Sequence, residues 1–500
     1  MTTELEIDLR ATTSEPEALA LMPESYAMEK KVMPLRIEDD TLLIAAHDLD
    51  PVQIREIQVL TRHRIRVVRA SLNQIEFAIR DRYGVLARVD QHVQEFSERT
   101  GIGSDLAAAA QIGDDSPVVQ IANLLITQGL RDRASDIHIE PQQTRLRVRF
   151  RIDGILKDAL DLPRTMAPAL ASRIKVMANM DIVDRHRSQD GQIRIEGEGR
   201  QVDIRVSTAE TIWGEKVVMR LLDQGRTLLK LDELGLAEQP YHRLSALLRS
   251  PYGMIVVSGP TGSGKTTTLY GAIRELDAST QNITTIEDPV EYTFEDINQM
   301  QIRRMANLTF ANGLKAILRQ DPDVILVGEI RDLETAEIAI QSALTGHLVL
   351  SSLHATDAAG VIQRFIEMGI EGFLISSALV GVLGQRLVRR ICRFCPEPYQ
   401  PSAAEMRLWE EFRPLDKEVF YRGAGCDNCA GTGYRGRVGV FEVLPLSETI
   451  KRMISDKASS QAIREQAMAE GMATLRSDAV SKVAADMTTL SEVMRCVWLI

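Results

Sequence analysis

The sequence predicts an α/β protein made of several domains. The chain has 500 residues, and at about 150 residues per domain this length favours about three to four domains. From Leu231 to about Gln385, short apolar strands alternate with segments of helical periodicity, which is the pattern of a parallel sheet flanked by helices. A glycine-rich loop in this region follows a strand and precedes a helix, a connection typical of the same fold class.

Composition and charge exclude several classes of protein. The chain is 44% hydrophobic, and its formal net charge of −11 argues against a general binder of nucleic acid or anionic membranes, since such proteins usually carry a basic excess. The N-terminal residues lack the basic and apolar regions of a signal peptide, and the longest uncharged run, Gly372 to Gln385, is too short to span a bilayer. We therefore expect a cytoplasmic protein that binds no nucleic acid and reaches a membrane only through partner proteins.

Changes in pattern along the chain predict six segments. Strands over Leu42–Ala46 and Ile65–Val68, with helical spacing up to Tyr83, form a small α/β pattern without a catalytic constellation, which suggests a docking domain. Glycines and an alanine run then indicate a flexible linker. The predicted segments are the docking domain (1–95), the linker (96–116), a second N-terminal domain (117–230), the α/β core (231–390), a cysteine module (391–437) and a helical C-terminal region (438–500).

The second domain is predicted to hold a strand in which arginines alternate with apolar residues and which ends at the hairpin turn Asp153-Gly154. The arginines that share one face of this strand are Arg145, Arg147, Arg149 and Arg151. This face can be a charged sheet edge that blocks aggregation, or it can contact phosphates or another subunit. Two later strands carry Arg205 and Arg220 on the faces opposite their apolar residues.

The glycine-rich loop is a complete Walker A sequence. Its residues, with the threonine that follows, are Gly259, Pro260, Thr261, Gly262, Ser263, Gly264, Lys265, Thr266 and Thr267. In such a loop the backbone N–H groups turn inward around phosphates, Lys265 reaches the β and γ phosphates, and the Thr266 hydroxyl is placed to ligate Mg²⁺. The sequence thus predicts a site for a nucleoside triphosphate rather than a glycine-rich turn with an incidental lysine.

Two strands that follow the loop end in acidic residues. Glu287 ends the strand from Ile283, and Glu329 follows the strand Val324–Val327 in the place of a Walker B acid. Because phosphoryl transfer to water needs Mg²⁺ and a carboxylate that orients the nucleophile, both glutamates are candidates for these roles. The alternative for each is a helix cap or a turn. Position 328 is glycine where Walker B strands usually have aspartate, so the acid that contacts Mg²⁺ stays open.

Two histidines, His347 and His354, bracket another apolar strand. They are candidates for sensing the γ phosphate by hydrogen bonding, and the alternative is a structural role for each.

Four of the five cysteines form two Cys-x-x-Cys pairs, Cys392 with Cys395 and Cys426 with Cys429. Four thiolates suit a closed tetrahedral Zn²⁺ site, which would be structural because no position is left for water. A redox dithiol and free thiols are the alternatives. Cys496 stands apart and is predicted to be a packing residue.

Taken in order, these motifs resemble the secretion ATPases of the type II/type IV pilus superfamily, most closely the general secretory pathway protein E branch. The resemblance covers the chain from about Leu21 to the C-terminus. Besides Walker A and the cysteine pairs, it rests on the segments Ser135–Glu140, Leu318–Asp323, Gly328–Asp332 and Thr345–His347. It implies a RecA-like P-loop ATPase core, a PAS-like α+β second domain, and ATP, Mg²⁺ and Zn²⁺ as cofactors.

The resemblance also assigns roles to residues. The segment at Glu287 corresponds to the family's Asp box, and the segment from His347 to His354 corresponds to its His box. Arg205 and Arg220 match arginines that reach the nucleotide phosphates, so they become candidate arginine fingers, and Arg319 matches another family arginine. Asn312 and Lys315 stand where the family has arginines, so that part of the pattern is not kept.

The resemblance finally implies partners and a function. The family forms homo-hexamers beneath the inner membrane, where residues 1–95 would bind the cytoplasmic domain of a secretion protein and the ring would contact a platform protein. The expected function is ATP hydrolysis that drives pseudopilus assembly and export of folded proteins. Alternatives are a type IV pilus extension ATPase, which usually has a longer N-terminal region, and a poorly hydrolysing assembly scaffold. A retraction motor is disfavoured by the cysteine module, and a DNA translocase is disfavoured by the acidic charge.

Overall fold

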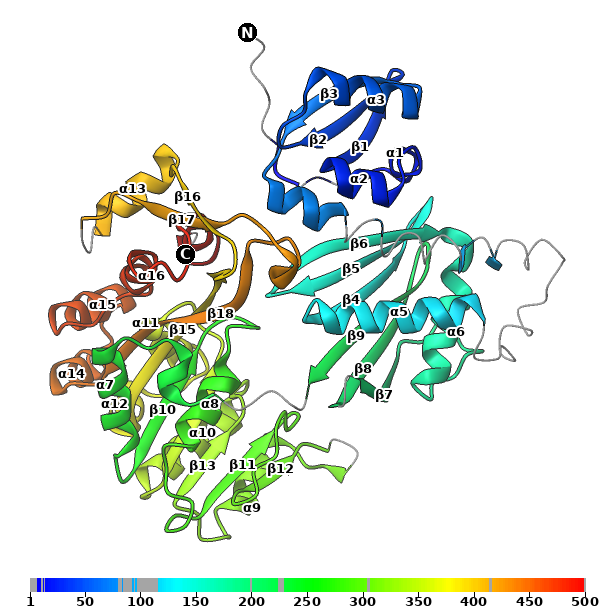
Figure 1. Ribbon diagram of the computed structural model, residues 1–500. Helices are drawn as coiled ribbons and strands as arrows, with labels where there is room; N and C mark the ends of the chain where they lie inside the picture. Colours follow the sequence, from blue (N-terminus) through cyan, green and yellow to red (C-terminus); the bar gives the residue numbers. More distant parts are fainter. Residues whose placement is uncertain are drawn as a thin grey trace. The chain divides into compact units, whose positions relative to one another are not determined.

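The computed structural model describes residues 7–9, 12, 14–79, 83, 92–93, 95–96, 116–197, 200–223, 229–303, 306–412 and 416–498 (Figure 1). Contacts divide the chain into two compact units. The first comprises Met1–Arg226, Ile391–Glu397 and Arg422–Arg435, and the second comprises Thr227–Arg390, Pro398–Tyr421 and Gly436–Ile500. Almost all of the predicted linker lies outside the described residues.

The N-terminal part of the first unit is a small three-stranded sheet. Strand β2 (Thr41–Ala46) pairs antiparallel with β1 (Val32–Glu38) and parallel with β3 (Arg64–Arg69), which confirms both predicted strands. A parallel pair needs a crossover, and helix α3 (Pro51–Thr61) provides it. The side chain of Asp50 caps α3 by accepting from Gln53 N at 2.7 Å. The other helices here are α1 (Pro16–Ala20), α2 (Glu24–Lys30) and a helix over residues 72–79.

The rest of the first unit contains a six-stranded antiparallel sheet in the order β6-β5-β4-β9-β8-β7. Helices α5 (Pro117–Arg131) and α6 (Ala167–Met177) pack against its apolar face (Figure 1). The predicted turn at Asp153-Gly154 is confirmed, because both residues have the left-handed φ that a tight hairpin turn requires, 47° and 89°. The strands are β4 (Ala134–Pro141), β5 (Arg145–Ile152), β6 (Ile155–Pro163), β7 (Gln189–Gly197), β8 (Arg200–Thr211) and β9 (Gly214–Asp223).

The second unit is built on a seven-stranded sheet in the order β12-β11-β13-β14-β10-β15-β18. The pairs from β12 through β15 are parallel, as the alternating strand and helix pattern predicts. The carboxyl ends of these strands therefore meet at one edge, where ligands bind in such sheets. The strands are β10 (Gly253–Ser258), β11 (Ile283–Glu287), β12 (Asn298–Gln301), β13 (Val324–Val327), β14 (Leu348–Leu353), β15 (Leu379–Ile391) and β18 (Tyr434–Pro445).

Each face of this sheet buries its own apolar cluster. Along β10, Ile255 and Val257 pack with α7 (Glu238–Leu248) and α8 (Lys265–Ile273), whereas Met254 and Val256 belong to the cluster on the other face. A strand buried on both faces reads as a continuous apolar run, as this one does. The helices of the second face are α9 (Phe310–Ile317), α10 (Leu333–Leu344), α11 (Ala358–Glu367), α12 (Gly372–Ala378), α14 (Glu448–Ser455) and α15 (Ser460–Ala469).

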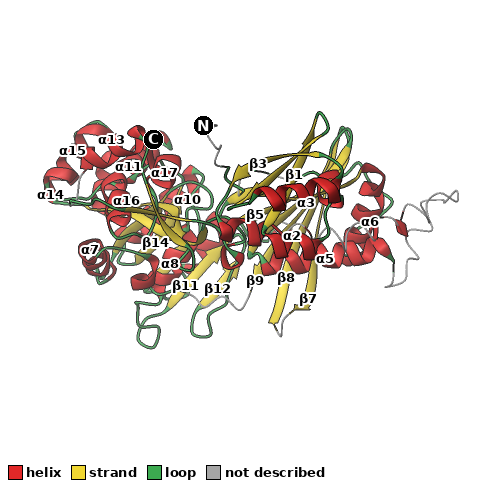
Figure 2. Ribbon diagram, turned by 45° about the horizontal axis from the view of Figure 1, so that its top comes forward, coloured by secondary structure: helices red, strands yellow, loops and turns green. Residues whose placement is uncertain are grey.

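The C-terminal region is helical from Glu448 onward, whereas residues 438–445 belong to β18, and its helices group near α11 (Figure 2). The apolar stripe through Leu490, Val493 and Val497 is core packing, because all three side chains are buried in one cluster. The remaining elements are α13 (Ala403–Phe412), α16 (Leu475–Ala484), α17 (Leu490–Val493) and the paired strands β16 (Pro396–Tyr399) and β17 (Phe420–Gly423). Among the described residues, no helix is both long enough and apolar enough to cross a bilayer.

Candidate nucleotide and metal sites

The Walker A loop lies at the carboxyl end of the fully buried strand β10 and leads into α8. Gly262 and Gly264 have φ of 77° and 88°, in the left-handed region that favours glycine. A Cβ at Gly264 would also lie 2.9 Å from Gln385 Nε2, so the Gln385 side chain would have to move to admit one. Thr266 is exposed in the first turn of α8, where a hydroxyl can reach a metal beside the phosphates. The local sequence therefore builds the loop that the motif predicts.

Lys265 lies across its own loop. Its Nζ donates to Gly259 O at 2.8 Å and to Pro260 O at 3.1 Å, and it lies 3.4 Å from His354 Nδ1. Burial lowers the pKa of Lys265 below its ordinary value, and the negative charge of Glu329 opposes this change. The ammonium group is thus held at the inner side of the loop, within reach of a bound phosphate.

Glu329 and His354 meet beside this lysine. His354 Nε2 lies 3.0 Å from Glu329 Oε1, and Arg331 Nη2 lies 2.7 Å from Glu329 Oε2. Burial alone would raise the pKa of Glu329, but the Arg331 hydrogen bond and the charges of Arg331, His354 and Lys265 outweigh it and hold the pKa below its ordinary value. The structure therefore brings an ionised carboxylate, a histidine and the Walker lysine together at the carboxyl edge of the sheet.

Glu287 accepts hydrogen bonds from three nearby side chains on α8, β11 and β12. Its carboxylate accepts from the hydroxyls of Tyr270 and Thr285, the latter at 2.6 Å, and from Gln299 Nε2 at 3.2 Å. Burial, followed by the hydrogen bond to Glu287, raises the pKa of Tyr270. These contacts tie the carboxylate to α8 and β12 rather than to Lys265 or Glu329.

Two predicted nucleotide contacts lie at the opposite edge of the sheet. His347 precedes β14, whereas His354 follows it, so a whole strand separates them; the His347 ring contacts Ser342 O at 2.9 Å. Arg319 lies in the loop that enters the amino end of β13, and the end of this loop contacts the start of β14 through Leu348 N and Asp323 O, 3.0 Å apart. Because parallel strands place their amino ends together, neither residue shares the Lys265 site within this chain.

Lys315, which stands where the family has an arginine, pairs with Glu334 at 2.6 Å.

The arginine face of β5 is an internal ion-pair network. Strand β5 lies between β6 and β4, so the expectation of a charged sheet edge is wrong. The acid on each arginine belongs to the same sheet: Arg145 pairs with Asp161 at 2.5 Å, Arg147 with Asp158 at 2.7 Å, Arg149 with Glu140 at 2.7 Å and Arg151 with Asp136 at 3.6 Å. Burial opposes ionisation of Glu140, yet Arg149 and Lys216 lower its pKa to about 2.

Arg205 and Arg220 are direct cross-strand neighbours on β8 and β9. Arg220 Nε donates to Asp136 Oδ1 at 3.0 Å, while most of the Arg220 side chain is exposed. The two predicted arginine fingers thus share one face of the six-stranded sheet.

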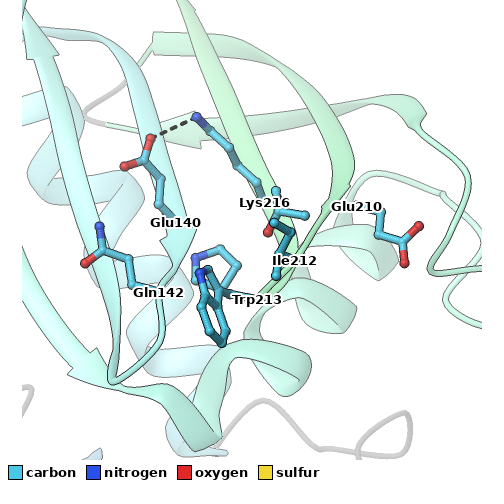
Figure 3. Close-up of a pocket in the computed structure, with 8 residues that line it drawn as sticks. Glu140, Gln142, Glu210, Ile212, Trp213 and Lys216 are labelled. Atoms are coloured by element: carbon cyan, nitrogen blue, oxygen red, sulfur yellow. Dashed lines mark ion pairs between the residues drawn. The ribbon is translucent and has the colours of Figure 1, made fainter.

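The same sheet carries a shallow cavity that the sequence did not indicate (Figure 3). Glu140 and Lys216 pair across it at 2.9 Å, and the exposed side chains of Ile212 and Trp213 form the tip of the hairpin beside it. Arg164 stacks on the Trp213 ring, with 5.3 Å between the guanidinium carbon and the ring centroid. The residues that line this cavity include none of the predicted site residues.

The structure brings the four predicted metal ligands together. The Sγ atoms of Cys392, Cys395, Cys426 and Cys429 all lie within 4.8 Å of one another. Neighbouring sulfurs are separated by 3.7 Å (Cys426 to Cys429), 3.8 Å (Cys392 to Cys426) and 3.9 Å (Cys395 to Cys429), close to the edge of about 3.8 Å that Zn–S bonds of about 2.3 Å give a tetrahedron. These separations are far longer than a disulfide bond. The donor set fits Zn²⁺.

Backbone N–H groups support this cluster. Gly433 N and Cys426 N lie 3.3 Å and 3.1 Å from Cys429 Sγ, and Gly425 N lies 3.3 Å from Cys395 Sγ. Such donors favour thiolates, the form of cysteine that ligates metals. The loop after Cys429 packs on the six-stranded sheet, where Lys157 Nζ donates to Ala430 O at 2.9 Å.

Sequence reasoning missed three polar residues around the nucleotide loop: Tyr270, Gln385 and Arg331. Arg331 stands two positions after Glu329 in a segment that carries the family resemblance, so a signal for it was present. Tyr270 and Gln385 become recognisable only when α8 is packed against β11 and β15, because their partners are distant in the sequence.

Comparisons with known proteins agree with this architecture. A family profile described as Type II/IV secretion system protein matches residues 111–495, and an MshEN domain profile matches residues 3–88. Among solved structures, the Legionella pneumophila ATPase DotB superposes with a TM-score of 0.55 at 19% identity, over 75% of this chain and 94% of that chain. This likeness supports the fold alone.

Sequence relatives extend over nearly the whole chain. The type II secretion system protein E of Pseudomonas aeruginosa is 41% identical over 98% of both chains, and the type II secretion system ATPase E of Vibrio cholerae is 39% identical over 96% of this chain and 97% of its own. The type IV pilus assembly ATPase PilB of Myxococcus xanthus is also 41% identical, over 98% of this chain and 88% of its own. With the profile match over most of its length, the chain is an ATPase of the type II/IV secretion system protein family.

Proposed function

We propose that this chain is the Mg²⁺-dependent ATPase motor of a type II protein secretion system. It hydrolyses ATP to drive assembly of a pseudopilus and the export of folded proteins across the outer membrane. The observation that carries the proposal is the convergence of Lys265, His354 and Glu329 at the carboxyl edge of the parallel sheet. Relatives named for type II secretion, similar over nearly their full length, support the choice of cellular process.

The residues divide the work of phosphoryl transfer. Backbone N–H groups of the Walker A loop and the ammonium of Lys265 bind the phosphates, and Thr266 with the ionised Glu329 would hold Mg²⁺ and orient the attacking water. The metal, when bound, offsets charge on the transferred phosphoryl group. His354 senses the γ phosphate from its place between Lys265 and Glu329.

Glu287 supports this site through its hydrogen bond with Tyr270, which lies on the helix that begins at Lys265. We leave His347 and Arg319 out of the nucleotide site because both lie at the other edge of the sheet.

The remaining assignments concern assembly. We propose that the chain forms a homo-hexamer in which Arg205 and Arg220 act as arginine fingers on bound ATP. Residues 1–95 dock on the cytoplasmic domain of an inner-membrane secretion protein, residues 96–116 are a linker, and residues 117–230 form the domain that carries the fingers. Residues 231–390 hydrolyse ATP, residues 391–437 bind Zn²⁺, and residues 438–500 complete the core. The ring works in the cytoplasm, peripheral to the inner membrane, against a platform protein.

The substitution Glu329→Gln tests the motor against a scaffold that hydrolyses poorly. The change keeps the shape of the side chain but removes the charge that would hold Mg²⁺, so we expect kcat to fall by about 100-fold or more, while ATP affinity changes by less than about threefold. The measurements are steady-state phosphate release and equilibrium binding of a fluorescent ATP analogue. Glu367→Gln, at an exposed carboxylate on α11, is the control. Wild-type export from a strain that carries Glu329→Gln contradicts the motor role.

A type IV pilus extension ATPase is the second candidate, because PilB is as similar to the chain as the type II protein of Pseudomonas aeruginosa. The chemistry would be the same and the filament different.

A further inference from the structure

A pair of buried opposite charges lies behind the nucleotide loop. Arg386 on β15 is 7% exposed and Glu442 on β18 is 3% exposed, and neither belongs to a motif that the sequence indicated. Burial raises the pKa of Glu442 and lowers the pKa of Arg386, and the charge of each opposes that change in the other. Burying a charged group costs free energy unless the group is hydrogen-bonded or lies near an opposite charge, so the contacts of Arg386 and Glu442 indicate what their burial achieves.

Both side chains hold the backbone that follows His354. Arg386 Nη2 donates to Thr356 O at 2.7 Å, and Ala358 N donates to Glu442 Oε1 at 2.9 Å. Between these contacts, Ser258 Oγ donates to Asp357 O at 3.3 Å. Buried polar groups from three strands, β10, β15 and β18, therefore hold the short segment between β14 and α11.

The same pair connects this segment with other parts of the second unit. The other carboxylate oxygen of Glu442 accepts from Leu475 N, the first residue of α16, at 3.3 Å. Gln385, the neighbour of Arg386, accepts from Thr268 Oγ1 of α8 at 2.8 Å. Strands β15 and β18 thus contact the Walker helix, the segment after His354 and a C-terminal helix.

His354 lies directly before this segment. Its ring lies 3.4 Å from Lys265 Nζ and 3.0 Å from Glu329 Oε1, and Thr356 is only two residues away. A shift of about 1 Å away from Lys265 and Glu329 would lengthen both contacts to about 4 Å or more, which is beyond hydrogen-bonding distance. Misplacement of that size can lower a rate by about 100-fold.

We propose that Arg386 and Glu442 are positioning residues, which hold His354 in place for ATP hydrolysis by fixing the backbone of Thr356 to Ala358. The inference rests on the proposed function, because it needs His354 to act on the γ phosphate. A role in stability alone is the competing explanation, and it makes a different prediction for kinetics.

The chain offers a matched control for stability. Lys482 and Asp478 form a buried ion pair of 2.7 Å, and Asp478 accepts from the backbone N of Phe441, the residue before Glu442. Lys482→Met and Arg386→Met each remove a buried cation whose charge offsets that of a buried carboxylate, so both are expected to lower the thermal midpoint. Only Arg386→Met also releases Thr356.

The experiment measures kcat, KM and thermal midpoint for Arg386→Met, Lys482→Met, His354→Ala and the double variant Arg386→Met with His354→Ala, all well below their midpoints. We expect Arg386→Met and His354→Ala each to lower kcat by about 10- to 100-fold with little change in KM. The double variant should be no slower than the slower single variant, because both changes remove the same interaction. Lys482→Met should keep kcat within about twofold.

If Arg386→Met does not fold, Arg386→Lys replaces it in the same measurements. It keeps the positive charge beside Glu442 but loses the fork of donors, so stability should return while kcat recovers only in part.

The results separate the inference from the proposed function. The inference is overturned if Arg386→Met loses stability as Lys482→Met does but keeps kcat, if the effects of Arg386→Met and His354→Ala multiply, or if His354→Ala keeps the wild-type kcat. Absence of ATP hydrolysis in the wild-type protein would instead contradict the proposed function.

Discussion

Charge compensation explains how ionised side chains persist in the interior of this protein. Glu329 stays ionised because Arg331, His354 and Lys265 surround it, and this makes it an acceptor for a metal or a water rather than a proton donor. Glu492 on α17 is a second case, far from the predicted chemistry in the sequence. Burial would raise the pKa of Glu492, but Arg495 and Arg389 outweigh it and lower the pKa to about 2. The same physics therefore serves a candidate catalytic group and a structural one.

Glu492 makes stability depend on pH in a defined window. Because its pKa is lower in the folded state, its stabilising effect is complete above about pH 5 and is lost as the pH falls towards 2. We expect Glu492→Gln to destabilise the protein at pH 7, and the difference in unfolding free energy from the wild type to shrink by roughly 2 kcal/mol between pH 6 and pH 3. Urea denaturation at stepped pH measures it, with Glu367→Gln as the exposed control. A difference that does not change with pH contradicts the assignment.

At the scale of elements, the strand ends decide which predicted residues meet. The Walker loop, the Glu329 segment and His354 all follow strands of one parallel sheet, so they share its carboxyl edge. His347 and Arg319 stand before strands, so the same rule places them at the other edge. The position of the four cysteines does not depend on strand ends. The two short loops that carry them bury little apolar surface of their own, so a metal or the neighbouring sheet must stabilise them.

Removal of the metal ligands tests that element directly. Cys392→Ser with Cys395→Ser should abolish zinc binding and make residues near 391–437 sensitive to protease, because the loops lose a cross-link whose apparent free energy in small zinc domains is about 10 kcal/mol. Nucleotide affinity should be unchanged, since the Lys265 site uses none of these residues. Metal analysis and mass mapping of proteolytic cuts measure both effects, and Cys496→Ser is the control that keeps zinc. Wild-type protein without zinc, or the same cuts in both proteins, contradicts this account.

At the scale of the whole molecule, features with a local sequence pattern could be predicted, whereas features that depend on contacts between distant residues could not. The strands, the Walker loop and the paired cysteines were predictable because each rests on periodicity or spacing within a few residues. The internal position of β5 was not, since strand order decides whether an arginine strand is an edge. The roles of Arg386 and Glu442 could not be predicted either, because they depend on contacts with Thr356 and Ala358 that no sequence motif indicates.

The proposed motor function predicts that a single residue of the second unit, Lys265, is needed for protein export by the whole cell. The most direct test is a chromosomal Lys265→Ala strain, scored in parallel for exoprotein in the medium and for pili on the surface, with Lys315→Ala as a lysine control away from the Walker loop. Without the ammonium that binds the phosphates, we expect secretion to fall to background while surface pili stay at the wild-type level. Lost pili with normal secretion would move the chain to the pilus branch, and wild-type levels of both would contradict the account.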